Sequence, residues 1–285
     1  MNNNITEYLY RIKDNIKAVE NGHREISIFD EIEYDFYQFL ELIKLFMISE
    51  RDSYYGYFMM NLTFKADFCS KNVAGIKLNT YPPVMDSNPL LLCRFPLKMI
   101  IFIICHEIEH IVLNHPAEMV RANPTGDSDI HEKFNLAADA SVNDRLRYEI
   151  KKENRKFMAV PDGIILSETL KKMFNLRNVR PLENYGYYFD LIKNKDNHDK
   201  GTDSSENGSS FYSDEFESDD IITQYNCGKT EDHNWSDSDD ADEITDIVKD
   251  LINASTELMD DEIRENMPEH YLEQVKLINE PPKIS

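Results

Sequence analysis

The sequence has few basic residues, with 31 lysines and arginines against 53 acidic residues in 285 positions and a formal net charge of -22. Proteins that bind nucleic acid or anionic membranes electrostatically need a positive surface. No basic patch along this chain could override the total. We therefore expect neither nucleic acid nor a membrane as a partner.

Cysteines are also scarce. The four, Cys69, Cys93, Cys105 and Cys227, form no CxxC pair, which argues against a zinc ribbon and a dense disulfide framework. The longest apolar run, Met99 to Cys105, is far shorter than the roughly 20 residues of a membrane-spanning helix. The N-terminus also lacks the apolar stretch of a signal peptide. We expect reduced thiols and a cytoplasmic protein.

The acidic charge is concentrated in one segment. Residues 196–243 contain sixteen acidic residues and two lysines, together with many Ser, Asn and Gly. This composition has too little apolar surface to offset the entropy of ordering, so residues 195–220 are predicted to form an acidic flexible loop. A solvated spacer is the simpler interpretation of this loop, and ligand capture is the alternative.

Hydrophobic periodicity predicts an α+β fold, mainly helical with a small β-sheet. Residues 58–92 are predicted to hold two short strands and a loop, and 1–57 an N-terminal helical segment. A helix is expected to begin at Pro96 and to end near Asn114, where Pro116 stops it. Further helices are predicted at 132–151, 166–174, 183–193, 244–259 and 269–278. The predicted core is 58–194, and 221–285 forms the C-terminal helical part of the same domain.

The helix that begins at Pro96 carries the motif His106-Glu107-Ile-Glu-His110. Histidines four residues apart share one helix face, roughly 6 Å apart at Cβ, so both rings can reach one metal ion. Glu107 can then take a proton from a water on that metal. This is the HExxH pattern of zinc peptidases. The alternative is a histidine pair satisfied inside a core, with Glu107 and Glu109 exposed.

A zinc peptidase needs a third protein ligand. Asp139 is the candidate, because it lies on the predicted second helix among alanines that would allow close packing, and Asn143 could orient a neighbouring ligand. A surface or N-terminal helix charge is the alternative for Asp139. His115 lies about 180° from His106 around an unbroken helix, so it could bind the metal only if the helix ended first.

The ordered set of motifs resembles a bacterial family of metallopeptidase domains that usually precede a von Willebrand factor A-like domain and are often encoded beside a MoxR-type AAA ATPase. The matching motifs are Asn88-Pro89, the HExxH motif with His115, Asn135 to Asn143, Pro161 to Gly163, Tyr185 to Leu191, and Asp232 to Trp235. The sequence ends at Ser285, about where the A-like domain would start, so we expect that domain to be absent from this sequence, either naturally or by truncation.

The resemblance implies a zincin-like fold with an HExxH active-site helix, bound Zn²⁺, a protein or peptide substrate, and an AAA ATPase or A-like protein as partner. His106, His110 and Asp139 carry over as metal ligands and Glu107 as the general base. His233 could donate to the transition state or serve as an alternative ligand. A structural histidine paired with Asp232 is the equal alternative for His233.

Two functions follow as competing hypotheses. The first is a zinc-dependent metallopeptidase in which Glu107 activates water, and in which 74–79 is an edge strand that aligns an extended substrate. Residues 73–79 could equally form an interior strand. The second is a catalytically inactive, metal-stabilised binding or adaptor domain that works with an ATPase or another partner.

Overall fold

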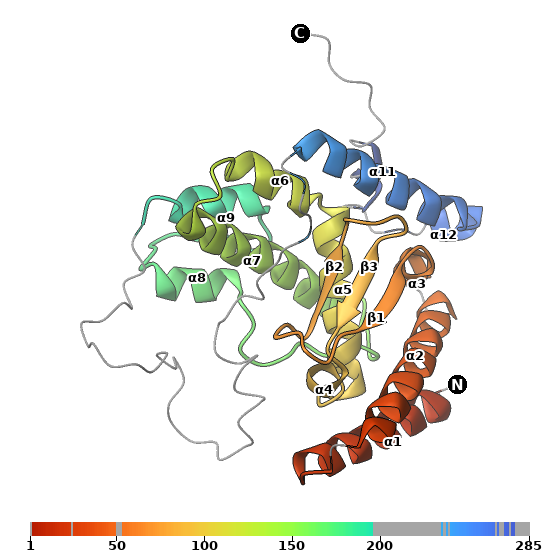
Figure 1. The fold of residues 1–285 in the computed structure, drawn as a ribbon. Helices are drawn as coiled ribbons and strands as arrows, with labels where there is room; N and C mark the ends of the chain where they lie inside the picture. The colour runs from red at the N-terminus through yellow and green to blue at the C-terminus, as the bar shows by residue number, and fades with distance from the viewer. Residues whose placement is uncertain are drawn as a thin grey trace, which may run out of the picture. The chain divides into compact units, whose positions relative to one another are not determined.

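The computed structural model describes residues 2–23, 25–49, 53–195, 235, 238, 240–265, 267, 271–273 and 275–276. The chain divides into two compact units, one made of residues 1–120 and 234–285 and the other of 121–233. Helices dominate and the strands form one small sheet, which is the predicted α+β class (Figure 1). His233 and, apart from Lys195, the predicted loop at 195–220 lie outside the described residues.

The first unit begins with two long helices, α1 (Asn2–Glu20) and α2 (Ile26–Ser49), that pack against each other. Their contact follows from apolar residues at helical spacing, which place one stripe of each helix in the core. The buried residues are Ile5, Leu9, Ile12 and Ile16 on α1, with Ile32, Phe36, Phe39, Leu40, Ile43, Phe46 and Met47 on α2. The predicted N-terminal helices are confirmed.

The sheet of the first unit has three strands in the order β1-β3-β2. They are β1 (Thr63–Ala66), β2 (Ala74–Lys77) and β3 (Val84–Ser87). β1 runs parallel to β3 and β2 antiparallel to it. Of the two alternatives for residues 73–79, the edge strand is therefore correct among the described residues, since β2 ends the strand order.

Two parts of the 58–92 prediction are wrong. β3 lies in the segment expected to be a loop. The loop is predicted because prolines and asparagines typical of turns enclose the four residues of this strand. Phe58 and Met59 belong not to a strand but to the helix α3 (Ser53–Met60), where they are buried with Tyr54 and Tyr55 at helical spacing. Alternation over a few residues cannot distinguish a short strand from such a helix.

After the short helix α4 (Pro89–Leu92), the central helix α5 (Leu97–Val112) lies against β2 (Figure 1). Pro96, the predicted first residue of this helix, is the cap residue, so α5 begins one position later than predicted, at Leu97. Every residue from Ile100 to Val112 is buried, so the motif stands in the core of the unit. Cys105 on α5, like Cys69 and Cys93, forms no disulfide.

The end of α5 differs from the prediction. Pro116 does not stop the helix, because it lies inside the next helix, α6 (His115–Ala122). The break occurs at Asn114, whose φ of 58° is left-handed and which follows the cap residue Leu113. Asparagine is one of the few residues that adopt this conformation readily. α6 therefore begins at His115, immediately after the break.

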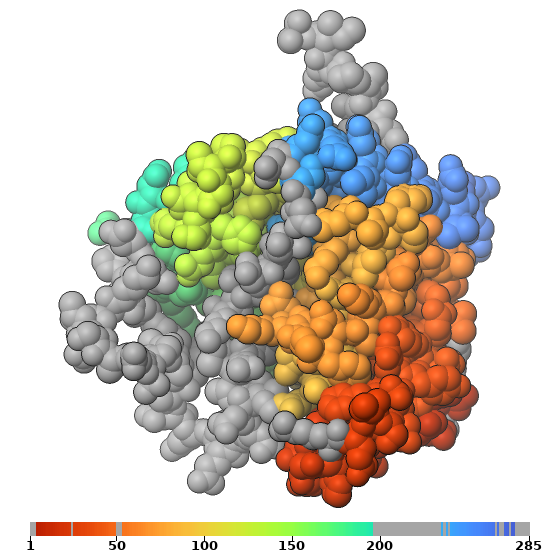
Figure 2. All heavy atoms as spheres, in the orientation of Figure 1, coloured from red at the N-terminus to blue at the C-terminus, as the bar shows by residue number. Residues whose placement is uncertain are grey.

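The C-terminal part of the first unit returns to the N-terminal part. α11 (Ala241–Glu257) packs against α3 and α5, and Asn61 donates to the Ser255 hydroxyl at 3.1 Å. Figure 2 shows α11 beside the segments that carry the strands. The short helix α12 (Asp261–Glu265) follows, and the described residues of the predicted helix at 269–278, namely 271–273 and 275–276, are helical. Among the described residues, no helix combines the length and apolarity needed to cross a membrane.

The second unit is built from α7 (Ser128–Lys152), α8 (Ser167–Met173) and α9 (Tyr185–Ile192), close to three of the predicted helices. α8 and α9 both pack on α7. The core contains Leu136, Ala137, Ala140, Ile165, Leu170, Phe174, Leu176, Tyr188 and Ile192. Two of the alanines near Asp139 therefore serve this core, where they allow α8 and α9 to approach closely.

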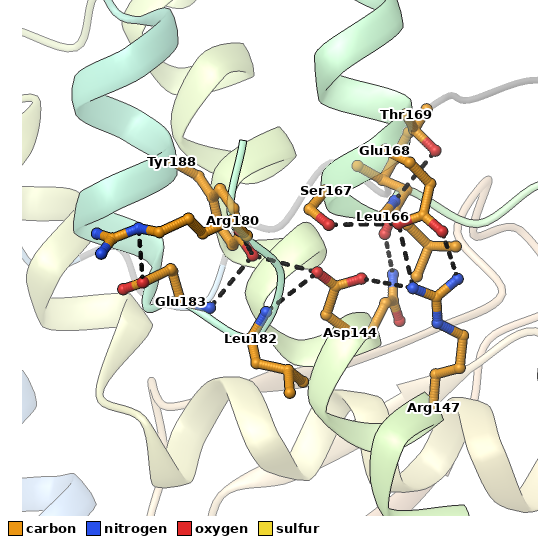
Figure 3. Close-up of polar contacts among 12 residues, drawn as sticks. Asp144, Arg147, Leu166, Ser167, Glu168, Thr169, Arg180, Leu182, Glu183 and Tyr188 are labelled. Atoms are coloured by element: carbon orange, nitrogen blue, oxygen red, sulfur yellow. Dashed lines mark hydrogen bonds and ion pairs between the residues drawn. The ribbon is translucent and has the colours of Figure 1, made fainter. Parts of the chain in front are cut away.

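Asp144 is the centre of a buried polar network in the second unit (Figure 3). It accepts hydrogen bonds from the Tyr188 hydroxyl at 3.1 Å and the Leu182 backbone N–H at 3.4 Å, and it pairs with Arg147. Burial raises the pKa of Tyr188 far above its usual range, so its hydroxyl stays a donor. The network ties the loop before α9, where Leu182 has a φ of 62°, to α7.

Replacement of Asp144 by asparagine is expected to lower the free energy of unfolding by about 1–3 kcal/mol, because a charged acceptor shared by buried donors is lost. Urea unfolding followed by circular dichroism measures the change. The matched control is Asp190→Asn on α9, whose ion pair with Lys193 is exposed and which should change stability by less than about 0.5 kcal/mol. Equal effects of the two substitutions would show that the network does not stabilise the fold.

Candidate metal centre

α5 carries three polar side chains of the motif into the core of the first unit. His106 is 6 % exposed, and Glu107 and His110 are fully buried. Helical periodicity places His106 and His110 on one face. Their ring centroids lie 4.5 Å apart, and the ring planes are inclined at 75° to each other. Glu109 is fully buried as well, so the alternative that left Glu107 and Glu109 exposed is wrong.

The two imidazoles approach each other through one nitrogen each. The Nε2 atoms of His106 and His110 lie 2.9 Å apart. Two ring nitrogens at this distance cannot both carry hydrogen, because two N–H groups would then point at each other. They need either a shared proton or a cation that accepts both lone pairs. This arrangement fits a metal ion held by imidazole nitrogen.

Asp139 contributes a carboxylate to the same group. It lies in the middle of α7 and is 6 % exposed, so the alternative of a surface charge or an N-terminal helix charge is wrong. One ligand atom from each of His106, His110 and Asp139 lies within 4.8 Å of the other two. Two imidazoles and one carboxylate are a donor set that transition metals such as zinc accept, and that leaves room for a further ligand.

Glu107 stands beside this group without being part of it. The nearer carboxylate oxygen lies 4.0 Å from Nε2 of His106, the same nitrogen that faces His110. A carboxylate at this position can accept a proton from a water molecule near the histidine nitrogens. The arrangement can therefore combine metal binding with proton transfer.

Glu109 was missed as a functional candidate by sequence reasoning. Its carboxylate accepts hydrogen bonds from the hydroxyls of Tyr55 at 2.8 Å and Tyr54 at 3.3 Å, both on α3. Tyr271 packs on Tyr54, with ring centroids 5.2 Å apart, and its pKa is raised above the usual range by burial and by the nearby negative charge of Glu109. These contacts fix the side of α5 next to His106. No sequence pattern points to this contact, because Tyr54 and Tyr55 lie more than fifty residues before Glu109 in the chain.

Two further aromatic side chains surround His110. Its Nδ1 lies 2.9 Å from Nδ1 of His115, the first residue of α6. On another side, the Trp235 ring centroid lies 5.4 Å from that of His110, and the Trp235 carbonyl accepts the Leu78 N–H at 2.7 Å. Trp235 therefore contacts both the end of β2 and His110 of the candidate metal centre. Asn143 donates its amide to the Ile165 carbonyl within the second unit, and its predicted role in orienting a ligand stays a prediction.

Comparison with protein families decides the classification. Residues 47–261 match the model of a family described as a putative metallopeptidase domain, which is more than half of the chain. The chain belongs to this family. The part that matches the metallopeptidase domain contains His106, Glu107, His110 and Asp139. No curated protein and no solved structure matches the chain.

Proposed function

We propose that the chain is a zinc-dependent metallopeptidase with a zincin-like arrangement of its HExxH helix. The observation that carries this proposal is the group of three buried ligand atoms, from His106, His110 and Asp139, with the Glu107 carboxylate next to it. Membership of the metallopeptidase domain family supports the same reaction class. Zinc is the proposed metal because the donor set combines nitrogen and oxygen, whereas calcium and magnesium prefer oxygen alone.

The residues would divide the work of hydrolysis as follows. His106, His110 and Asp139 would hold the ion, which would supply Lewis acidity for the scissile carbonyl and for a water molecule. Glu107 accepts a proton from that water while the water oxygen bonds to the carbonyl carbon. Glu107 then delivers the proton to the leaving nitrogen as the C–N bond breaks. Burial of Glu107 strengthens its electrostatic interactions during both transfers.

The edge strand β2 is the proposed place for the substrate main chain. The Val73 carbonyl accepts the Asn88 N–H on the side of β3, so Ala74 and Ile76 present their backbone groups to the opposite side. An extended peptide can pair with such an edge. Leu78 faces the same side and already donates to Trp235. The paired stretch would therefore lie at Ala74 and Ile76.

Metal removal tests the proposed function. We expect about one zinc per chain by mass spectrometry and cleavage of denatured casein that stops when a chelator removes the metal and resumes when Zn²⁺ is returned. A thermal unfolding curve of the same samples should show stabilisation by the bound metal. Zinc that stabilises the chain without any cleavage, even of a peptide library, would instead indicate the metal-stabilised adaptor.

A further inference from the structure

The contact between His110 and His115 assigns a role to a histidine outside the ligand group. His115 is buried, with 1 % of its surface exposed, and its Nδ1 faces Nδ1 of His110 at 2.9 Å. Nε2 of His110 is the nitrogen that faces His106. The two nitrogens of one imidazole point in diverging directions. His115 therefore lies on the side of His110 away from the metal-binding nitrogen.

The backbone between the two histidines explains how His115 reaches this position. On an unbroken helix it would follow His110 by five residues and point elsewhere. The left-handed residue Asn114 ends α5, and its carbonyl accepts the Glu118 N–H at 3.1 Å in the first turn of α6. Asn114 is itself held by a hydrogen bond to the Thr245 hydroxyl at 3.2 Å. The break turns the chain so that His115 faces back toward His110.

The number of hydrogens on each imidazole determines the direction of the hydrogen bond between His110 and His115 when metal is bound. A neutral imidazole has one N–H and one lone pair. If the lone pair of His110 Nε2 goes to the metal, its hydrogen lies on Nδ1, and His115 Nδ1 must accept it. His115 then carries its own hydrogen on Nε2. Each ring is left with one tautomer.

We infer that His115 is a positioning residue that accepts the Nδ1–H of His110 and thereby holds the Nε2 lone pair of His110 toward the metal. This inference rests on the proposed metal centre. Partners of this kind orient metal-binding histidines and increase their basicity, and their loss typically costs roughly 10- to 100-fold in metal affinity. In this arrangement His115 is not a metal ligand, because its Nδ1 is engaged with His110 and its Nε2 carries hydrogen.

The test compares two substitutions in the full chain. His115→Phe keeps a flat ring but removes the acceptor, and Zn²⁺ titrated against a competing chelator should bind about 10- to 100-fold more weakly. His115→Asn places an amide oxygen near the position of Nδ1 and should bind Zn²⁺ within about threefold of the unchanged chain. If His115→Phe does not fold, His115→Leu replaces it. The control His23→Leu removes an exposed histidine and should change nothing.

Nitrogen NMR of histidine-labelled protein gives a second readout that a purely structural role would not change. With Zn²⁺ bound, His110 should show a hydrogen on Nδ1, and its hydrogen-bonded shift should be lost in His115→Phe and retained in His115→Asn. Equal Zn²⁺ affinity of His115→Phe and the unchanged chain overturns the inference, as does an asparagine variant as weak as the phenylalanine variant. An unchanged chain that takes up no Zn²⁺ overturns the proposed metal centre instead.

Discussion

Replacement of Glu107 by glutamine is expected to leave the zinc content unchanged and to lower the rate of peptide hydrolysis by at least about 100-fold. Glutamine keeps the size of the side chain but cannot accept a proton from water. The metal should stay, because Glu107 is not among the three residues that form the ligand group. Zinc content by mass spectrometry and cleavage of denatured casein measure the two properties on the same sample.

The matched control is Glu132→Gln, which makes the same chemical change at an exposed position on α7. It should retain both zinc and full activity. Unchanged proteolysis by the Glu107→Gln chain would contradict the proposed role of Glu107 as the general base. Loss of zinc from that chain would show that Glu107 takes part in holding the metal.

Replacement of Asp139 by asparagine should weaken Zn²⁺ binding by at least about 100-fold, since loss of a direct ligand exceeds the effect of an outer partner. The comparison variant is Asp144→Asn, which changes a second buried aspartate of the same helix. It removes the charge and one of the two acceptor oxygens that Tyr188, Leu182 and Arg147 share, and it should weaken folding while leaving Zn²⁺ affinity within about threefold. Chelator competition and urea unfolding measure the two effects.

We thus expect the two aspartate variants to show opposite effects on metal affinity and on stability. Asp139→Asn should lose metal and keep the stability of the metal-free chain, whereas Asp144→Asn should keep metal and lose stability. Equal Zn²⁺ affinity of the Asp139→Asn chain and the unchanged chain would remove Asp139 from the metal centre. The reaction would then need a different third ligand.

The helices that carry the candidate site could be predicted because their signals are long. α5 contains the apolar run Met99 to Cys105, about two helical turns, and α7 holds the small residues around Asp139. The HExxH spacing alone brings His106 and His110 together, since helix geometry decides which side chains share a face. Zinc, the zincin-like arrangement and the roles of the site residues stay proposals, and the ATPase and A-like partners stay predictions.

The missed elements are short or depend on one backbone residue. β3 has four residues, and tertiary pairing with β1 and β2 outweighs its weak local preference. α6 depends on the left-handed conformation of Asn114, which composition does not reveal. The partners of Glu109 and His110 could not be predicted from the sequence either. They lie on α3 and α6, and only the packed chain brings them to α5.

The division of the first unit into two stretches of chain has a consequence for the order of folding during synthesis. Domains fold as units, beginning with those completed first on the ribosome. Residues 121–233 are contiguous, whereas the first unit needs residues 234–285 as well. Until α11 and Trp235 have been synthesised, α3 and α5 lack the helix that packs on them, and His110 lacks its indole neighbour. The second unit can thus fold before the part of the first unit that carries His106 and His110 is complete.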